Sequence, residues 1–277
     1  MAKETPSSWS DVHSRDKRRR RRVIYNFLVA LGYFAILGIL WIFIYSPVFS
    51  VRNVEIIGNK NVSSDDIMTL AKSEVAGGSF WKRIFGMRNM LIWPERLSES
   101  LKYISELKSV SIEKDYGENK IKMIVEERKQ FGSWCLKNRG GGQSPDSFGY
   151  NCFWFDPDGV IFQRSIGMEG NLIVVVNDYS QKKLGLNLKI LPDEFIADMF
   201  SIFRAISSSG ISVKEIRLND LSLQEIEVDT YDGPKIYFSL RFSADNTAEV
   251  IKSLRQKQNF GSLQYIDFRV ENRAYYK

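Results

Sequence analysis

The chain has 277 residues, enough for one large domain or two of ordinary size, and a formal net charge of +6. Residues 1–22 hold eight basic and three acidic side chains, so they account for +5 of that charge. Nucleic-acid binding requires positive charge that is clustered on the folded part of a protein. Because the remainder of the chain is nearly balanced, we expect no nucleic-acid partner and assign the basicity to an N-terminal tail.

An apolar segment, residues 23–45, follows this tail. It contains no charged side chain and only one strongly polar one, Asn26. A helix of this length reaches roughly 34 Å, enough to cross a hydrocarbon core of about 30 Å. The segment is too long for a cleaved signal peptide and is followed by a poor cleavage site. We therefore expect a retained single-pass anchor in membrane lipid. The basic block at 17–22 predicts that residues 1–22 are cytoplasmic and that the bulk of the chain lies outside.

The next 80 residues, 49–128, contain short elements that predict a β-α-α-β-β domain. A strand that ends near Gly58 precedes a helix with serine caps and two aspartates in its first turn. A second helix is predicted from Pro94 onward, and two alternating strands, "KSVSIEKDY" and "NKIKMIVEER", complete the order. The loop at 77–93 is rich in glycine and aromatic residues. It is a candidate contact patch, a part of the domain's own packing or a membrane-surface segment, and the sequence leaves these three alternatives open.

Residues 129–277 predict a second, α+β domain. The stretch Asp156-Pro157-Asp158-Gly159 has the residue preferences of a type I turn. A helix is expected at 192–209 because its apolar residues follow one stripe, and a second helix is expected after Ala244. Between and around these helices lie several short strands. Strands in runs with two flanking helices predict an antiparallel sheet that is covered by helices.

The candidate chemistry of the chain is sparse. The only histidine, His13, lies in the predicted cytoplasmic tail, where it cannot serve a site beyond the membrane. Asp156 and Asp158 fit a turn better than a calcium loop. The carboxylates of Glu126 and Glu127 are adjacent in a predicted strand, so they point to opposite faces and cannot act together on one substrate. We expect neither an enzyme active site nor a metal or cofactor site.

The two cysteines, Cys135 and Cys152, flank a stretch that is rich in glycine, serine and asparagine. A disulfide is expected if this part of the chain lies outside the cytoplasm, where thiols are oxidised. Two buried free thiols are the alternative. The spacing lacks a C-x-x-C redox motif, so the expected role of the pair is structural.

The chain ends in "SLQYIDFRVENRAYYK" (262–277), which alternates apolar and polar residues and carries three tyrosines. We expect this segment to form a strand at a sheet margin, with backbone groups available to a strand from a partner. An internal strand, with its tyrosines packed on the second helix, is the alternative. Side chains of binding-prone types and their neighbours form the candidate partner site: Tyr265, Asp267, Arg269, Asn272, Tyr275 and Tyr276.

The order of four motifs supports a family resemblance. "FSVRNVEIIGNKNVSSDDI" (49–67) resembles the start of a POTRA domain. Its position after one membrane span and before "VEERKQFGSW" (125–134) resembles the FtsQ/DivIB family of bacterial cell-division proteins. "FDPDGVIF" (155–162) and "YIDFR" (265–269) match the hairpin and the last strand of that family. Lys129 and Gly132 stand where the family commonly has Pro and Ala.

The resemblance implies a non-catalytic scaffold of the division machinery, located in the cell membrane at the division septum. In this family the last strands of the β domain capture membrane-proximal segments of the small coiled-coil proteins FtsB and FtsL. Asp267 and Arg269 agree with the family pattern, whereas Val270 replaces a frequent aromatic residue. A POTRA-containing secretion or outer-membrane assembly factor and a membrane-anchored peptidoglycan hydrolase are less favoured. No repeated POTRA module and no catalytic carboxylate pair are visible.

Overall fold

The computed structural model divides the chain into two compact units. The first contains Met1–Ile57, Ser64–Leu97 and Val110–Ile124, and the second contains Gly58–Ser63, Ser98–Ser109 and Val125–Lys277. The described residues are 9–77, 87–98, 100–137, 151–166, 173–180, 183–231, 233–257 and 260–277, with side chains described from residue 20 onward. Residues 1–8 of the basic tail, the His13 side chain and residues 78–86 of the 77–93 loop lie outside this description.

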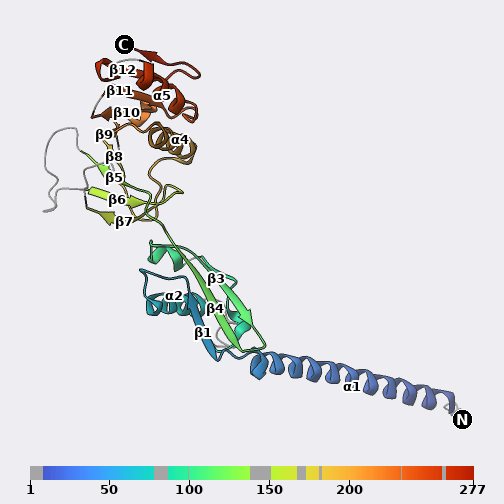
Figure 1. Cartoon of the computed structure of the whole chain (residues 1–277). Coiled ribbons are helices and arrows are strands. Elements are labelled where there is room, and N and C mark those ends of the chain that lie inside the picture. Colours follow the sequence, from blue (N-terminus) through green and yellow to red (C-terminus); the bar gives the residue numbers. More distant parts are fainter. Residues whose placement is uncertain are drawn as a thin grey trace, which may run out of the picture. The chain divides into compact units, whose positions relative to one another are not determined.

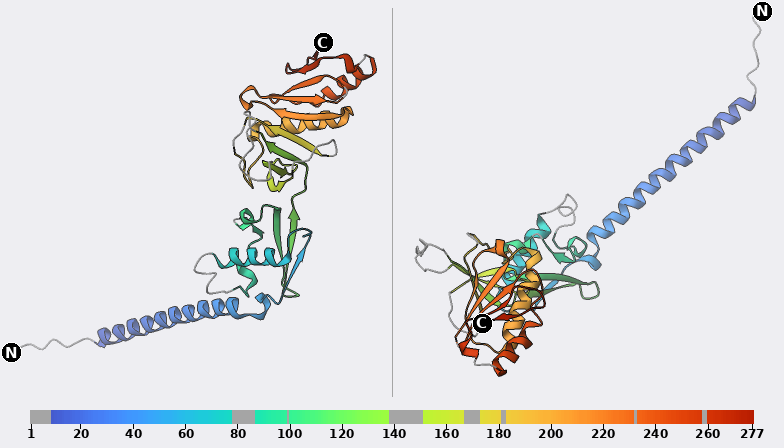
Figure 2. Two further views of the ribbon diagram at one scale, coloured as in Figure 1. Left: turned by 90° about the vertical axis from the view of Figure 1, so that its left-hand side faces the viewer. Right: turned by 90° about the horizontal axis from the view of Figure 1, so that it is seen from above.

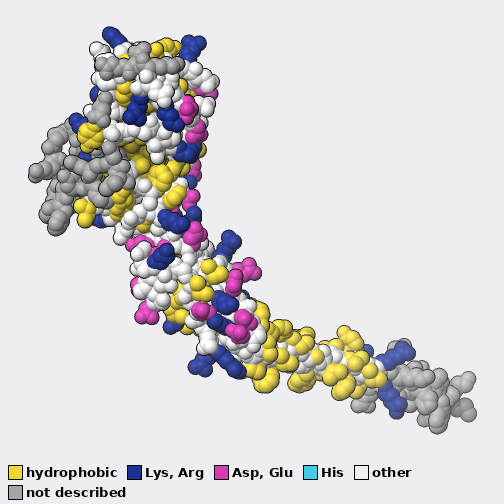
Figure 3. Space-filling view, in the orientation of Figure 1, with side chains coloured by type: hydrophobic (Ala, Val, Ile, Leu, Met, Phe, Trp, Pro, Cys, Tyr) yellow, Lys and Arg dark blue, Asp and Glu magenta, His cyan; other side chains and the backbone are white. Residues whose placement is uncertain are grey.

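The first unit begins with one long helix, α1 (Trp9–Tyr45) (Figure 1). Its stretch Arg20–Tyr45 is long and apolar enough to cross a membrane. Hydrophobic side chains are exposed along this stretch, and basic side chains lie at its N-terminal end (Figure 3). An apolar helix that is exposed on all sides is unfavourable in water but suits a hydrocarbon environment. The sequence prediction of an N-terminal apolar helix is confirmed.

A four-stranded sheet follows, in the order β1 (Asn53–Ile57), β4 (Lys120–Glu127), β3 (Leu107–Asp115) and β2 (Arg96–Leu97). β1 runs parallel to β4, whereas β2 runs antiparallel to β3. Helix α2 (Ser64–Ala76) buries one stripe of apolar side chains, namely Ile67, Leu70, Ala71 and Val75. On β4 the buried residues alternate with solvent-facing ones, as the period of two in its sequence predicts.

The prediction of a second helix from Pro94 onward is wrong. The segment from Pro94 forms the short strand β2 and a 3₁₀ helix, Ser100–Tyr103, in place of an α-helix. Leu97, which lies within the predicted helix, is paired with Val110 of β3. Serine side chains compete for backbone hydrogen bonds and weaken helices, so tertiary pairing prevails over a marginal helical propensity here.

The second unit is built on a large sheet. Its strand order within the described residues is β13-β12-β11-β10-β9-β8-β5-β6-β7. The bounds are β5 (Gly132–Leu136), β6 (Asn151–Phe155), β7 (Ile161–Ser165), β8 (Val174–Asp178), β9 (Val213–Leu218), β10 (Glu225–Thr230), β11 (Lys235–Ser239), β12 (Tyr265–Phe268) and β13 (Tyr275–Tyr276). Helices α4 (Asp193–Ser209) and α5 (Thr247–Lys257) lie on the same face of this sheet (Figure 2). The α+β fold class is confirmed.

The sheet is mixed, which corrects the expectation of an antiparallel one. The pairs β5–β8, β8–β9 and β11–β12 are parallel. Helix α4 connects β8 to β9, and α5 connects β11 to β12. A helical crossover returns the chain to the end of the sheet from which it started, so the strands that it joins must run in the same direction.

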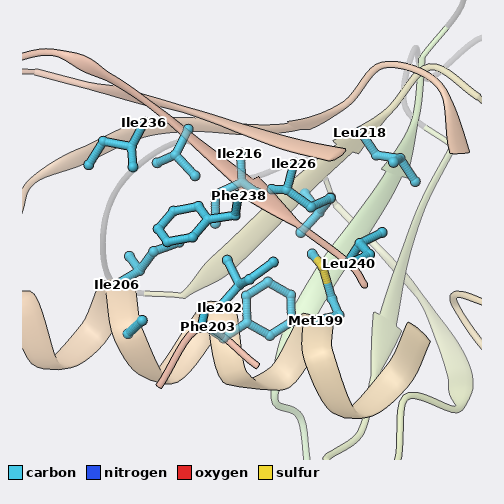
Figure 4. Packing of buried hydrophobic residues seen from close by; sticks show 14 of the residues in the cluster. Met199, Ile202, Phe203, Ile206, Ile216, Leu218, Ile226, Ile236, Phe238 and Leu240 are labelled. Atoms are coloured by element: carbon cyan, nitrogen blue, oxygen red, sulfur yellow. The ribbon is translucent and has the colours of Figure 1, made fainter. Parts of the chain in front are cut away.

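The core of the second unit lies between α4, α5 and one face of the sheet. Figure 4 shows the α4 side chains pointing toward apolar residues of the strands. The labelled residues are Met199, Ile202, Phe203 and Ile206 on α4, and Ile216, Leu218, Ile226, Ile236, Phe238 and Leu240 on or beside the strands. The stripe on α4 matches the predicted spacing. The helix ends at Gly210, whose positive φ of 68° suits a left-handed C-terminal residue.

The predicted turn after β6 is present and is held by a buried carboxylate. Asp156 is 1% exposed and accepts hydrogen bonds from the N–H groups of Asp158 (2.9 Å) and Val160 (2.8 Å). Its second oxygen accepts from Arg128, at 2.5 Å. The φ of 76° at Gly159 completes the turn. The turn and the ion pair together satisfy a carboxylate that is otherwise costly to bury.

The residue before Arg128 also has a defined role. The Glu127 carboxylate accepts hydrogen bonds from the backbone N–H groups of Lys60 (2.7 Å), Asn61 (2.9 Å) and Val62 (3.0 Å). Burial raises the pKa of Glu127, but these N–H groups outweigh that effect and leave its pKa below the usual range. The adjacent residues Glu127 and Arg128 thus fasten two different loops of the second unit.

Cys135 and Cys152 form a disulfide, as predicted. They lie directly opposite each other in the antiparallel pair β5–β6, and both are buried. Closing a loop with a sequence separation of 17 stabilises the folded state by about 3 kcal/mol in the chain-entropy model.

The double variant Cys135→Ala/Cys152→Ala should therefore lose about 3 kcal/mol of unfolding free energy. Pulse proteolysis of the detergent-solubilised full chain along a urea gradient measures this loss. Reduction of the wild-type protein should lower the midpoint by a similar amount and should leave the double variant unchanged. Equal midpoints for the wild-type and double-variant proteins would contradict the assignment.

Candidate partner-binding edge

The last 13 residues of the chain form a strand, a turn and a second, very short strand. β12 pairs with β11 in a parallel manner on one side and with β13 in an antiparallel manner on the other. The Arg273 N–H donates to the Val270 carbonyl at 3.2 Å, and Asn272 has a positive φ of 57°. This turn folds the chain end back onto β12. The expectation of one continuous margin strand over 262–277 is therefore corrected, because the outer strand is β13 alone.

The candidate residues accordingly fall into two groups. Tyr265 and Asp267 lie on β12, inside the sheet, and Arg269 directly follows this strand. Ile266 and Phe268 of β12 are buried in the core. Because successive side chains on a strand alternate between faces, Tyr265, Asp267 and Arg269 belong to the face opposite α4 and α5, called here the open face. They offer side chains rather than free backbone groups.

At this end of the sheet, the outer edge belongs to β13. The Lys277 N–H donates to the Tyr265 carbonyl at 3.3 Å, and the Gln264 N–H donates to the Lys277 carbonyl at 2.6 Å. Lys277 therefore directs its backbone groups toward β12, and in an antiparallel ladder the preceding residue, Tyr276, directs its own away. β13 is the last strand in the order formed by the described residues. The Tyr275 and Tyr276 side chains are 46% and 49% exposed.

Arg269 connects side chains from three strands on the open face, next to this edge. Its Nε donates to Asp267 Oδ1 at 2.9 Å and its terminal nitrogens donate to Asp267 Oδ2 at 2.6 Å and to Glu225 at 3.0 Å. Its guanidinium carbon lies 4.8 Å from the centre of the Tyr237 ring, a cation–π arrangement. Three strands, β10, β11 and β12, are thereby linked next to the chain end.

The charges in this cluster stabilise one another. Hydrogen bonds from Arg269 hold the pKa of Asp267 below its usual range, although burial opposes that shift. The same contacts raise the pKa of Arg269 still further above neutrality. The pair is therefore fully ionised at neutral pH. Sequence reasoning selected Asp267 and Arg269 but missed Glu225 and Tyr237, because no local pattern connects residues that lie 30 or more positions apart in the chain.

The open face continues as a polar row across the sheet. Directly opposite residues from β8 to β13 are Asn177, Arg217, Glu227, Tyr237, Asp267 and Tyr275. Arg217 forms ion pairs with Asp229 and, at 3.3 Å, with Glu227, and Lys235 approaches Glu227 at 2.6 Å. Cross-strand pairs of opposite charge stabilise neighbouring strands, so this row supports the strands that carry the edge.

The described residues contain no group of three or more His, Cys, Asp or Glu side chains arranged to hold a metal ion. A hollow of about 390 Å³ in the first unit is lined by Glu95, Arg96, Ile112, Lys114 and Tyr116. Burial lowers the pKa of Lys114 there, and the charge of Glu95 partly opposes this effect. The C-terminal edge, with its exposed tyrosines, is the candidate partner-binding site.

Asp267→Asn should weaken the sheet end in a pH-dependent manner. The folded-state pKa of Asp267 is depressed, so its ion pair stabilises above the unfolded pKa of about 3.9, and this contribution is lost as the pH falls through the folded pKa. We expect a loss of about 1 kcal/mol at pH 7 that shrinks below about pH 4. Urea unfolding at several pH values measures it. Glu271→Gln, an exposed change in the adjacent turn, is the control, and an equal, pH-independent loss in both variants would contradict the role of Asp267.

Comparison with known families identifies the domain type of the first folded region. Residues 49–128 match the model of the POTRA domain, FtsQ-type. The match begins just after helix α1 and covers the four-stranded sheet with α2. No curated protein matches the chain. An FtsQ-type POTRA domain that directly follows an N-terminal apolar helix supports the similarity of this chain to FtsQ/DivIB proteins.

Proposed function

We propose that this protein is a non-catalytic, membrane-anchored scaffold of the bacterial division machinery that binds partner division proteins through the outer edge of β13. One observation carries the proposal. β13 ends the strand order formed by the described residues, and the backbone groups of Tyr276 are directed away from β12. An unpaired strand edge is a template for a strand from another chain. The FtsQ-type POTRA domain supports the division context.

The proposed mechanism is strand addition. An extended segment of the partner pairs with β13, and main-chain hydrogen bonds supply affinity. Tyr275, Tyr276 and Asn272 lie on or next to this edge and contact the added segment. Asp267 and Arg269 lie one strand away from β13, on the open face. There they contact side chains of the partner segment that extend past the edge, and so they contribute to selectivity. Because both are already paired with each other, they present a fixed surface rather than flexible charges.

The proposed partners are small single-pass coiled-coil division proteins of the FtsB and FtsL type. Their membrane-proximal segments are close to the bilayer that also holds helix α1. A short segment that becomes ordered only on pairing loses conformational entropy, so a preformed edge is required to make the association favourable. The POTRA domain is a second docking unit in this proposal, for other proteins of the division machinery.

The proposed topology has a cytoplasmic N-terminus and a folded part outside, in the cell membrane at the division septum. The basic side chains before the apolar helix support this orientation. The Cys135–Cys152 disulfide supports it independently, since disulfides persist in oxidising compartments. Two features from separate parts of the chain thus favour the same orientation.

Tyr276→Pro should impair partner binding without unfolding the sheet. Proline removes the outward N–H of Tyr276, and proline is tolerated on the solvent side of an edge strand. The loss of one hydrogen bond costs about 1 kcal/mol, which corresponds to roughly a fivefold weaker association. Binding of the full-length chain in nanodiscs to FtsB- and FtsL-type proteins, measured by biolayer interferometry, tests this expectation.

Tyr276→Ala is the matched control, because it removes the same aromatic ring and keeps the backbone N–H. Binding should be weaker for the proline variant than for the alanine variant. Circular dichroism should show unchanged secondary structure in both. If the proline and alanine variants bind equally well, strand addition at β13 is not the mode of capture.

A further inference from the structure

The end of helix α1 is held directly by side chains of the POTRA region within the first unit. The Asn89 side-chain amide, which is 3% exposed, donates to the carbonyl of Phe43 at 2.9 Å. The Asn119 side-chain amide donates to the carbonyls of Pro47 at 2.6 Å and Ser50 at 2.9 Å. Carbonyls of a final helical turn have no partner within the helix. Asn89 replaces water as the partner of one carbonyl in this turn, and Asn119 binds carbonyls of the segment just after the helix. The segment that connects the helix to the domain is therefore held by side chains of the folded domain.

Ring contacts extend this connection. The Phe49 ring stacks on Phe43, in the last turn of α1, with centroids 5.5 Å apart. It also meets the Tyr116 ring edge-on at 6.1 Å. A 23-residue apolar helix is only slightly longer than a hydrocarbon core of about 30 Å, so its end at Tyr45 lies at the bilayer surface. The residues that contact this end are consequently at headgroup level.

Several apolar side chains next to the helix end are exposed. Their exposed fractions are 52% for Val48, 43% for Tyr116, 40% for Met87 and 39% for Leu91. The Met87 carbonyl accepts from the indole N–H of Trp93 at 3.1 Å, and the Leu91 N–H donates to the Asn89 side chain at 2.9 Å. The backbone at both positions is therefore fixed while the side chains face outward. Met90 and Trp93, by contrast, pack inside their own domain.

Two arginines accompany these apolar side chains. Arg88 accepts a backbone hydrogen bond from Val51 at 2.6 Å, and the Arg52 N–H donates to the Asn119 carbonyl at 2.9 Å. Both side chains are exposed, and neither forms an ion pair with any residue that the structure describes. In the neighbouring turn, the Asp115 carboxylate is engaged by the N–H groups of Gly117 and Glu118. Guanidinium groups bind phosphate oxygens in a bidentate manner.

We propose that this juxtamembrane surface, formed by Val48, Arg52, Met87, Arg88, Leu91 and Tyr116, lies on the outer leaflet, with phospholipid headgroups as its ligand. The inference rests on the proposed anchor, because α1 must span the bilayer for the surface to reach the leaflet. The apolar side chains enter the boundary between headgroups and acyl chains, and the two arginines bind lipid phosphates. The POTRA domain is then held at a fixed distance from the membrane and does not move freely on a flexible linker.

A depth measurement on the full-length chain in anionic-lipid nanodiscs tests this inference. The native cysteines form a disulfide, so an introduced cysteine is the only reactive thiol among the described residues. An environment-sensitive fluorophore is placed at Met87→Cys, at Leu37→Cys in the middle of α1, and at Lys72→Cys on the exposed side of α2. Quenching by lipids with a shallow or a deep spin label reports the depth of each site.

We expect the label at 37 to be quenched by the deep lipid, the label at 87 by the shallow lipid, and the label at 72 by neither. If the labels at 87 and 72 behave alike while the label at 37 is quenched, the surface proposal is wrong and the anchor stands. If the label at 37 is not quenched, the anchor itself is wrong. Arg52→Glu/Arg88→Glu should reduce shallow quenching at 87, and an unchanged signal would remove the phosphate contact from the proposal.

Discussion

The structure of the second unit depends on the backbone hydrogen-bond ladder of its sheet and on the place where that ladder ends. Every strand in the middle of a sheet has its N–H and C=O groups paired on both sides, whereas an outer strand has one unpaired side. Helices α4 and α5 cross over one face and bury it, which fixes the order of β8 to β12. The turn after β12 adds two residues as β13 and moves the open edge to Tyr276.

The two faces of this sheet differ in polarity and in their contribution to the structure. The face toward α4 and α5 is apolar and supplies the hydrophobic stabilisation of the unit. The open face is polar, and a single row across it contains the disulfide cysteines, Arg217, Glu227, Asp267 and Tyr275. A covalent bond at one end of the row and ion pairs toward the other hold the strands in register. A rigid edge loses little entropy when it accepts a partner strand.

In the first unit, side-chain contacts restrict motion between helix α1 and the folded domain. Asn89 and Asn119 use side-chain amides to bind the carbonyls at and just after the end of α1, so the segment that connects the helix to the domain is held by side chains of the folded domain. If the domain is held near the bilayer as proposed, this restriction raises the effective concentration of its surfaces for partners that are anchored in the same membrane. In the proposed function, both units therefore favour association by limiting motion before a partner binds.

The sequence by itself determined the features that depend on local patterns. The apolar run at 23–45, the α4 stripe, the Asp156 turn and the strand alternation were each readable, because a few consecutive residues produce them. The tertiary structure decided the rest. The pairing of Leu97 with Val110 replaced a predicted helix, the return of β13 covered β12, and Glu225 reached Arg269 across 44 residues. These outcomes depend on contacts between distant segments, and the free energy of such contacts is not encoded in the residues of either segment alone.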